Sequence, residues 1–276
     1  MPSFALVRRV AGIAAILVLP ACGTTYSLPG VDEDAARGAN AMFAAARAEG
    51  PRIPASPSLG VARFNRVAAR VEPVAQRFCR VELAGKTGAD CRVGLELDTR
   101  MAERNAYFTY AGPGNTRPVI RFTLPMLQDV NSDDEVAFIL GHEYGHLIGQ
   151  HIVKQQQQAA AGALILGALT AYANAESGLP YDAEAVSRNM DLGAAIGNRA
   201  YSQSYELESD VIGTRIADAA GYDPVKGARF FARSEAAKSG GGKLSFWGTH
   251  PADAKRLAVV IATRNQIESN QALTRR

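Results

Sequence analysis

The sequence predicts an α+β fold that is mostly helical, with one small sheet placed before a buried central helix. Residues 59–78 carry an apolar stripe at helical spacing, and strand-like runs follow at 92–97, 106–110 and 119–124, separated by Gly- and Pro-rich turns. The helix that begins near residue 132 is apolar on all sides, as expected for a helix packed inside a domain. These patterns place the sheet immediately before the central helix.

The start of the central helix is marked by its own residues. Ser132 followed three positions later by Glu135 is a capping-box pattern, in which side chains satisfy the free N–H groups of the first turn. Asp133 and Asp134 add negative charge where the helix dipole favours it. We therefore expect the helix to begin at Ser132.

Two histidines and a glutamate lie on this otherwise apolar helix. His142 and His146 are four residues apart, so both imidazoles can reach one ion from the same helix face. Glu143 is adjacent and is placed to take a proton from water held there. This H-E-x-x-H arrangement predicts a zinc site with Glu143 as general base.

Two candidates compete for the third ligand. His151 follows Gly149, but the longer metzincin pattern requires histidine at position 152, where this chain has Ile152. In a continuous helix His151 would also lie about 180° from His142. We expect a packing or surface histidine there.

Glu206 is the preferred third ligand. It shares a helix face with Asp210, which can hold a ligating imidazole by its other ring nitrogen. Glu208 points about 200° away from Glu206 and is interpreted as solvated.

The N-terminus has the pattern of an export signal. Residues 1–21 combine Arg8 and Arg9 with an apolar run too short to span a bilayer, and Leu-Pro-Ala precedes Cys22. This run is similar to the bacterial lipoprotein lipobox, which implies cleavage before Cys22 and acylation of that cysteine. Several acyl chains would anchor the protein stably, and the absence of aspartate after Cys22 favours the outer membrane. The alternative is an ordinary cleaved signal followed by a free thiol.

The mature chain is interpreted as a tether, residues 22–58, followed by one domain, residues 59–276. The tether is rich in Gly, Pro, Ala and Ser, with a possible helix at 34–49. Removing the signal lowers the formal charge from +3 to +1, which gives no electrostatic case for nucleic acid. The apolar run 159–172 predicts a close-packed helix, because it is shorter than the ~20 residues needed to cross a membrane; membrane insertion is the alternative.

Cys79 and Cys91 remain as an even pair once Cys22 carries lipid. They flank 81–83 and a turn-like Gly-rich segment, so a short antiparallel hairpin would bring them together in an oxidising compartment. We expect a disulfide, with two unpaired buried thiols as the alternative.

Over much of residues 60–265 the chain resembles the HtpX-like zinc metallopeptidases of the gluzincin group, particularly their soluble periplasmic lipoprotein members. The resemblance rests on the segment 123–127, H-E-Y-G-H at 142–146, E-x-x-x-D at 206–210 and H-P-x-x-x-x-R at 250–256. One departure is Gln203, where an arginine often precedes the glutamate by three.

The resemblance implies a zincin-like fold with one zinc ion per chain. His142, His146 and Glu206 would be the ligands, Glu143 the catalytic base and Asp210 a partner of a ligating histidine. The strand near 119–123 would hold an extended peptide by main-chain hydrogen bonds. Three residues are candidates to stabilise the oxyanion: His250, Arg256 and Tyr201.

The implied function is an endopeptidase of the bacterial cell envelope that degrades damaged or misassembled envelope proteins. Its partners would be unfolded polypeptide substrates and, through the lipid, the membrane facing the periplasm. The alternative is an assembly or chaperone-like lipoprotein with a latent zinc site.

His250 carries a separate hypothesis. It follows a glycine run at 240–242 and precedes Pro251, which fits the first position of a helix running to about residue 265. His250 would then ligate zinc in the resting enzyme and swing away when substrate enters, with the glycine run as hinge. A capping or surface histidine is the alternative.

Overall fold

The computed structural model describes residues 23–49, 52–178, 180–200, 202–232, 246–251 and 253–276. These residues form two compact units. The first, Thr25–Gly149 with Glu206–Arg276, contains the sheet and is called the sheet unit. The second, Gln150–Tyr205 with Gly23 and Thr24, is called the hairpin unit. Most of the described chain is helical, and the predicted α+β class is confirmed.

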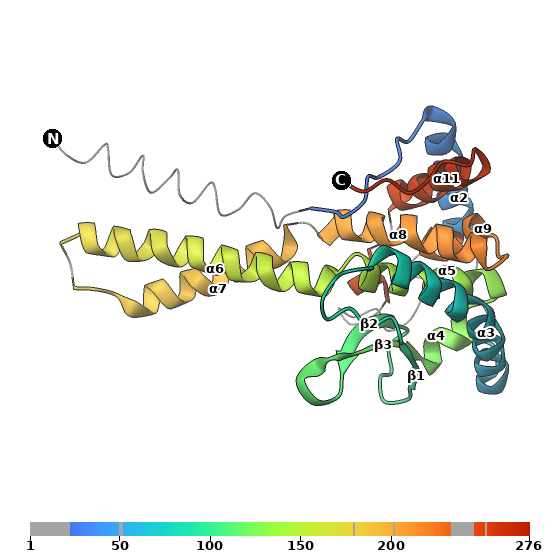
Figure 1. Cartoon of the computed structure of the whole chain (residues 1–276), viewed down its shortest axis with the longest axis horizontal. Coiled ribbons are helices and arrows are strands. Elements are labelled where there is room, and N and C mark those ends of the chain that lie inside the picture. The colour runs from blue at the N-terminus through green and yellow to red at the C-terminus, as the bar shows by residue number, and fades with distance from the viewer. Residues whose placement is uncertain (1–22, 50–51, 179, 201, 233–245, 252) are drawn as a thin grey trace. The chain divides into compact units, whose positions relative to one another are not determined.

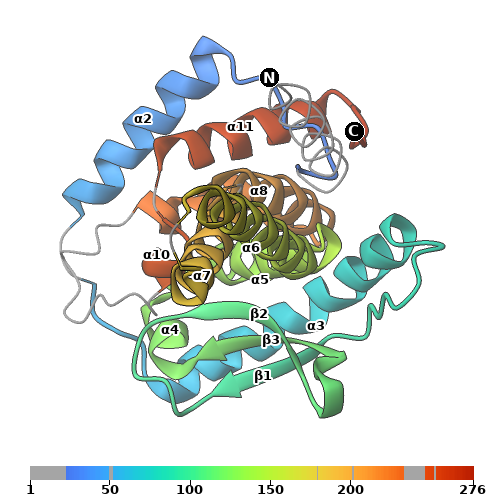
Figure 2. The ribbon, with the colours of Figure 1, turned by 90° about the vertical axis from the view of Figure 1, so that its left-hand side faces the viewer.

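A three-stranded sheet has the order β1-β3-β2 (Figure 2). The strands are β1 (Gly94–Asp98), β2 (Ala106–Ala111) and β3 (Arg117–Thr123). Each lies within two residues of its sequence prediction. β1 pairs parallel with β3, and β2 pairs antiparallel with β3. The central β3 buries its side chains on both faces, as its Val, Ile and Phe content favours.

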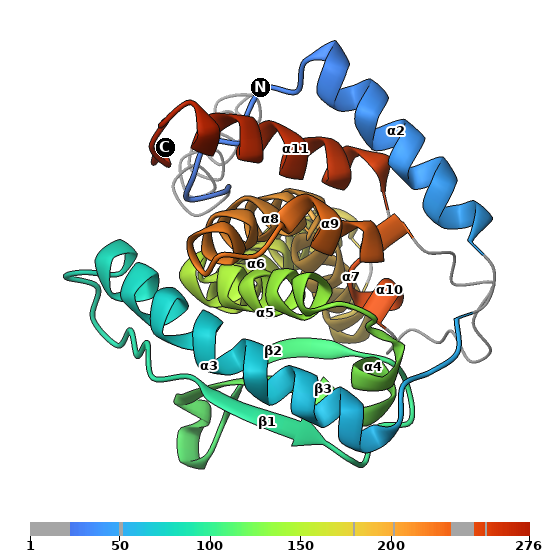
Figure 3. The ribbon, with the colours of Figure 1, turned by 90° about the vertical axis from the view of Figure 1, so that its right-hand side faces the viewer.

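Helix α3 (Pro57–Glu82) crosses one face of the sheet (Figures 2 and 3). It is capped by Ser56, and Phe64 packs on Phe122 of β3 with ring centroids 4.9 Å apart. The disulfide between Cys79 and Cys91 is present, with Cα atoms 5.8 Å apart. The predicted hairpin is wrong, because helix α3 continues through residues 81 and 82. The bond instead fastens the helix end to the segment that leads into β1.

Helix α5 (Asp133–Ile148) is the predicted central helix and begins as expected. Ser132 accepts a hydrogen bond from the Glu135 N–H, while the Glu135 carboxylate accepts one from the Asn131 N–H rather than from Ser132. The short helix α4 (Leu124–Asp129) precedes it. Within the sheet unit, α5 lies between the layer formed by α3 and the sheet and the layer formed by α8 (Ser202–Ala219) and α11 (Ala254–Glu268) (Figure 3).

The second half of the sheet unit is helical. Its elements are α8 (Ser202–Ala219), which starts in the hairpin unit, α9 (Pro224–Ala228), η2 (Arg229–Ala232), α10 (Phe246–Thr249) and α11 (Ala254–Glu268). Asp253 caps α11 by accepting a hydrogen bond from the Lys255 N–H. Helix α11 therefore begins three residues later than predicted, and Pro251 is not its first residue.

The segment predicted as a tether contains packed structure. Helix α2 (Glu33–Ala48) contacts α11, and its Ala35, Ala39 and Ala46 are buried. Ahead of it, Tyr26 forms a β-bridge with Arg275, so the two ends of the described chain lie side by side. This segment is buried because its small alanines allow close packing. The same high alanine content is also typical of a linker, which is why the sequence predicts a tether. The boundaries at residues 22 and 59 stay a prediction.

The hairpin unit consists of two antiparallel helices, α6 (His151–Glu176) and α7 (Ala183–Arg199) (Figure 1). Glycines hold them together: a Cβ on Gly162 would lie 2.1 Å from the Gly193 carbonyl oxygen. The run 159–172 is part of α6 and packs on α7 along one face. In the described part of the chain, no helix is long and apolar enough to cross a bilayer.

Candidate metal centre

Helices α5 and α8 touch through their backbones. A Cβ on Gly145 would lie 2.7 Å from Ser209 Cα, and one on Gly213 would lie 2.7 Å from the His142 nitrogen. Larger residues would hold the helix axes apart, because backbone contact requires residues without side chains at the crossing. This contact sets the histidines of α5 against the carboxylates of α8.

Four side chains converge between these helices and the segment before α11: His142, His146, Glu206 and His250. One ligand atom from each lies within 4.8 Å of all the others. His142 Nε2 is 3.1 Å from His146 Nε2 and 3.2 Å from His250 Nδ1. Glu206 Oε2 lies 3.4 Å from His142 Nε2 and 2.8 Å from His250 Nδ1, and Oε1 lies 3.4 Å from His146 Nε2.

This donor set fits zinc. Two donors bound to one ion at about 2.0–2.1 Å in a tetrahedron lie about 3.3 Å apart. Five of the donor separations given above are between 2.8 and 3.4 Å. Imidazole nitrogens and a carboxylate oxygen are the ligands that zinc commonly takes. His142, His146 and Glu206, which the sequence predicts, are thus brought together, and His250 joins them as the resting-ligand hypothesis expects.

Asp210 and Arg256 support the cluster through hydrogen bonds. Asp210 Oδ1 is 2.9 Å from His142 Nδ1, which leaves Nε2 of that ring directed at the other donors. Arg256 donates to both Asp210 oxygens, each at 2.7 Å, and its guanidinium lies 3.8 Å from the centre of the Phe231 ring. A buried carboxylate is stable only when it is paired in this way.

Arg256, an oxyanion candidate from the sequence, is almost completely buried. Its side chain is 2% exposed, and its contacts include Asp210, Glu206 at 3.3 Å and the Pro251 carbonyl oxygen at 3.4 Å. The guanidinium thus supports Asp210 and Glu206, and its role toward the oxyanion stays a prediction. Tyr201, the other oxyanion candidate from the sequence, lies outside the described residues.

Glu143 is fully buried and fixed on one side only. Its Oε2 accepts a hydrogen bond of 2.8 Å from the Phe108 N–H of β2. Its Oε1 has no hydrogen-bond partner among the described residues and lies 3.5 Å from His250 Nε2. A buried carboxylate oxygen without a donor is costly unless a proton or a water occupies it during the reaction. This orphaned oxygen is the position at which a proton can be accepted.

The electrostatics of the site separate the two glutamates. Burial raises the pKa of Glu143 above its ordinary value, against the opposing effect of the imidazoles of His250 and His142. Burial also acts to raise the pKa of Glu206, but His250, His146 and His142 outweigh it and hold that pKa well below the ordinary value. Glu206 therefore stays a carboxylate suited to bind a cation, whereas Glu143 is suited to exchange a proton.

The acids around His142 change the pKa of its ring. Burial acts to lower the pKa of His142, yet hydrogen bonds to Asp210 and Glu206 raise it to about 9. Arg256, in turn, lowers the pKa of Asp210 against the effect of burial. Asp210 and Glu206 thus favour positive charge at the His142 ring, and a bound cation would supply such charge at this position.

A protein-family model for peptidase family M48 matches residues 62–264 of this chain, which includes the four-residue cluster and its supporting acid. The chain belongs to peptidase family M48. Members of this family are zinc metallopeptidases, so the resemblance to gluzincin metallopeptidases is confirmed.

A curated relative gives a further comparison. Mitochondrial metalloendopeptidase OMA1 of Arabidopsis thaliana is 28% identical over 144 residues, which is 52% of this chain. The aligned part is 27% of that relative, so this M48 chain spans about a quarter of its length.

The sequence predictions for two further ionisable residues, His151 and Glu208, had different outcomes. His151 is buried and stacks on Tyr205 at 4.5 Å, and it is not one of the four converging residues, as the sequence predicts. Helix α5 does not continue into it, because Gln150 adopts φ +56° and starts α6. Glu208 was predicted to be solvated and is fully buried instead. It accepts a 2.6 Å hydrogen bond from the Tyr26 N–H.

Sequence patterns could not have found two of the contacts. Phe108 acts through its backbone N–H, which every residue except proline has, so no residue type marks it. Tyr26 is 182 residues from Glu208 in the chain. The backbone contact of α5 with α8 does have a signal, since Gly141 and Gly145 are four apart, as are Ser209 and Gly213.

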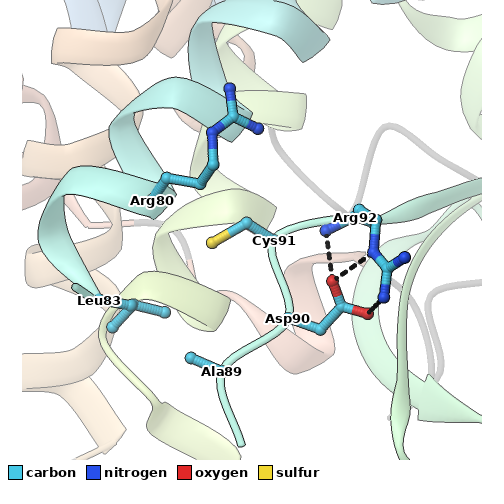
Figure 4. Close-up of a pocket in the computed structure, with 6 residues that line it drawn as sticks. All are labelled: Arg80, Leu83, Ala89, Asp90, Cys91 and Arg92. Carbon is cyan, nitrogen blue, oxygen red and sulfur yellow. Dashed lines mark hydrogen bonds and ion pairs between the residues drawn. The ribbon is translucent and has the colours of Figure 1, made fainter. Parts of the chain in front are cut away.

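A cavity of about 370 Å³ lies elsewhere in the sheet unit, beside the disulfide (Figure 4). Arg80, Leu83, Cys91 and Arg92 line it, together with residues 89 and 90. None of the converging residues is among them, and Arg92 is already paired with Asp90 at 3.1 Å. This hollow is therefore separate from the metal centre. The lipidation candidate Cys22 lies outside the described residues.

Proposed function

We propose that this chain is a zinc-dependent endopeptidase of the bacterial cell envelope that hydrolyses damaged or misassembled envelope proteins. The observation that carries the proposal is the orphaned, buried Oε1 of Glu143 beside the converging donors of His142, His146 and Glu206. Family membership supports peptide hydrolysis, and the relative whose name includes metalloendopeptidase supports cleavage within chains.

His142, His146 and Glu206 would hold one zinc ion per chain. When bound, zinc supplies a Lewis acid that polarises the scissile carbonyl and makes water more acidic. Glu143 accepts the proton of that water at Oε1, while the Phe108 N–H keeps Oε2 in place. The same oxygen then returns the proton to the leaving amine, which the raised pKa of Glu143 assists.

Strand β2 is the element suited to hold the substrate. The expectation that 119–123 holds the peptide is wrong, because β3 is the central strand and pairs on both sides. β2 is an edge strand and contacts α5. Since the Phe108 N–H points away from β3, the backbone groups of Ala106 and Tyr110 face the same free edge. An extended peptide added there would pass Glu143.

Such recognition uses main-chain hydrogen bonds, so it selects extended polypeptide more than a particular side chain. Unfolded segments meet this requirement, and segments within folded proteins do not. This supports a role in quality control. Residues 1–22 support the location: the lipobox-like run before Cys22 would place the enzyme in the periplasm, anchored by lipid, with the outer membrane as the favoured side.

A second candidate is a chaperone-like lipoprotein with a latent zinc site. Complete burial of Glu143 favours it, as does His250, whose Nδ1 lies among the donors. Under the first proposal the same observation is a resting state in which His250 is the fourth ligand and must leave before substrate enters. Residues 240–242, the proposed hinge, lie outside the described residues.

Casein digestion by the purified protein distinguishes the two. Glu143→Gln should retain zinc, measured by elemental analysis, and lose at least a hundredfold in kcat, because amide cannot accept the proton. Glu33→Gln, at an exposed carboxylate on α2, is the matched control and should keep full activity. If Glu143→Gln digests casein as fast as an active wild type, Glu143 is not the general base. If wild type does not digest casein at all, the chaperone-like function is favoured.

The role of His250 has its own test. His250→Ala should leave zinc bound through the three other donors and change kcat, upward if release of His250 limits turnover and downward if the imidazole also steadies the substrate. X-ray absorption on the wild-type zinc protein should then show three nitrogen donors at about 2.0–2.1 Å, and two in the variant. Unchanged kcat and unchanged coordination would leave His250 a structural residue.

A further inference from the structure

The hairpin unit buries only one face of each of its helices. Gly162, Gly193 and Gly197 place the backbones of α6 and α7 in contact, since a Cβ on Gly197 would lie 2.1 Å from the Gln158 carbonyl oxygen. Helices this close share a narrow seam, and the side chains that flank the seam stay uncovered within the unit.

Those uncovered side chains are apolar. Ile165, Leu169 and Tyr172 recur at i, i+4 and i+7 on α6 and are 36%, 57% and 47% exposed. Leu192 and Ile196 recur at i and i+4 on α7 and are 52% and 58% exposed. We call these five residues the apolar face; helical geometry, fixed by the glycine contacts, puts them on one side of the hairpin.

The apolar face is a concentrated feature of the described surface. Nine of the fourteen exposed large apolar side chains in the described chain belong to the hairpin unit. No charged residue occurs on α6 between Lys154 and Glu176. On α7, Arg188 and Asp191 are the charged residues between Glu184 and Arg199. A gathering of exposed apolar side chains of this kind marks an interaction site more often than an ordinary solvated face.

The charges at the two ends of the hairpin indicate what covers it. The tip carries three acids, Glu176, Asp182 and Glu184, against one nearby cation, Arg188, which lies 2.7 Å from Glu184 and 3.8 Å from Asp182. The base carries Lys154 and Arg199. An acidic tip is repelled by anionic lipid headgroups, whereas it complements the basic base of another hairpin.

We propose that the apolar face is a homodimer interface in which the hairpins of two copies pack antiparallel. This arrangement covers the exposed apolar side chains of both copies and brings each acidic tip to the other basic base. It forms a four-helix layer closed by a two-fold axis, so the same residues serve on both sides.

The pairing fixes a register. Lys154 and Glu176 are separated by about 33 Å along α6 at 1.5 Å per residue, with Ile165 midway. In the antiparallel dimer Ile165 therefore lies near the two-fold axis and meets its own copy. Glu176 of one copy lies near Lys154 of the other.

Cysteine cross-linking of the full chain in cell envelopes tests this register. Ile165→Cys should give a covalent dimer on a non-reducing gel, and a mixture of Glu176→Cys and Lys154→Cys chains should cross-link to each other but not to themselves. Val81→Cys, at a 67% exposed position on α3, is the matched control for random collision. A yield for Ile165→Cys no higher than for Val81→Cys would overturn the proposal, and self-linking of Glu176→Cys would replace it by a parallel pairing.

Charge reversal shows whether the apolar face is covered by a second copy of the chain or by a lipid surface. In the Ile165→Cys background, Lys154→Glu should lower the cross-linked fraction severalfold, and adding Glu176→Lys should restore it. Zinc content and casein digestion should not change, because neither residue belongs to the metal centre. If, in a Cys22→Ser chain that cannot be acylated there, Leu169→Asp instead abolishes flotation with phosphatidylglycerol vesicles while cross-linking is absent throughout, the face binds membrane and the dimer is wrong.

Discussion

Two pairs of helices in this molecule are joined by the same device and differ in what they enclose. α5 meets α8 through Gly141, Gly145 and Gly213, and α6 meets α7 through Gly162 and Gly193. The first pair encloses histidines and carboxylates that are almost completely buried. The second pair encloses little beyond its own seam and leaves large apolar side chains exposed.

The difference shows that close contact between two helices does not by itself create a functional site. Between α5 and α8, further layers from the sheet, α3 and α11 cover the pair, so polar groups brought together there are largely buried and must pair with one another or with an ion. In the hairpin unit no such layer lies over the apolar face. A backbone contact becomes a reaction site only where other elements exclude solvent around it.

The largest effect is expected from a substitution that separates α5 from α8. Gly145→Val places a branched side chain where even a Cβ would lie 2.7 Å from Ser209 Cα, so the helices must move apart. We expect complete loss of bound zinc, because the donors of α5 and α8 then no longer fit one ion. Elemental analysis of the purified variant measures it, with circular dichroism to show that helix is retained.

The matched change in the other pair is Gly193→Val. Its Cβ would lie 2.2 Å from the Gly162 carbonyl oxygen, which is a closer clash than the 2.7 Å approach at Gly145. We expect loss of helical signal from the hairpin with zinc content preserved. Gly38→Ala, where the new Cβ meets only Ile261 at an ordinary 3.6 Å, should change neither. Equal zinc in Gly145→Val and wild type would show that the contact does not set the donors.

The second prediction removes the acid that orients the cluster. Asp210→Ala leaves the Arg256 guanidinium buried without its bidentate partner and releases His142 Nδ1. Breaking a buried ion pair from one side costs about 3–5 kcal/mol. Urea denaturation should show a loss of this order, together with weaker zinc binding. Asp34→Ala, at an 88% exposed carboxylate on α2, should lose far less, and equal losses would mean that Asp210 has no special role.

Sequence reasoning predicted the parts of this site that depend on spacing within one helix. His142, Glu143 and His146 are fixed by the helix period, and Glu206 with Asp210 by the same period on α8. The strands were found because their side-chain pattern and turns are local. The same local reasoning gave the wrong result at Glu208, because the direction of a side chain on a helix does not say which other element covers it.

Contacts between distant segments were not predictable in this way. The burial of Glu208 depends on Tyr26, which pairs with Arg275 at the opposite end of the described chain. The role of Phe108 depends on strand order, since only an edge strand has a free N–H to give to Glu143. Such contacts are set by topology, which no spacing within one segment encodes.

The third prediction follows from that long-range contact. Glu208→Ala leaves the buried Tyr26 N–H without its acceptor, which costs about 1–3 kcal/mol. We expect a lower free energy of unfolding by urea and an unchanged zinc content, since Glu208 is not a donor in the cluster. Glu208→Gln keeps an acceptor oxygen and should recover most of the loss. If both variants match wild type, the N-terminal segment does not stabilise α8.

The smallest effect is expected at the histidine that belongs to the hairpin unit. His151→Ala removes a ring that stacks on Tyr205 at 4.5 Å with an interplanar angle of 16°, and aromatic pairs of this kind contribute about 0.5–1.5 kcal/mol. Zinc content and kcat should stay within about twofold of wild type, a difference worth roughly 0.4 kcal/mol. Glu206→Ala, measured beside it, should lose zinc, because it removes the carboxylate donor of the cluster. The opposite outcome, with zinc lost in His151→Ala and kept in Glu206→Ala, would require His151 to replace Glu206 as the third ligand. It would also erase the distinction between the two helix pairs, because a residue at the start of α6 would then be part of the metal centre.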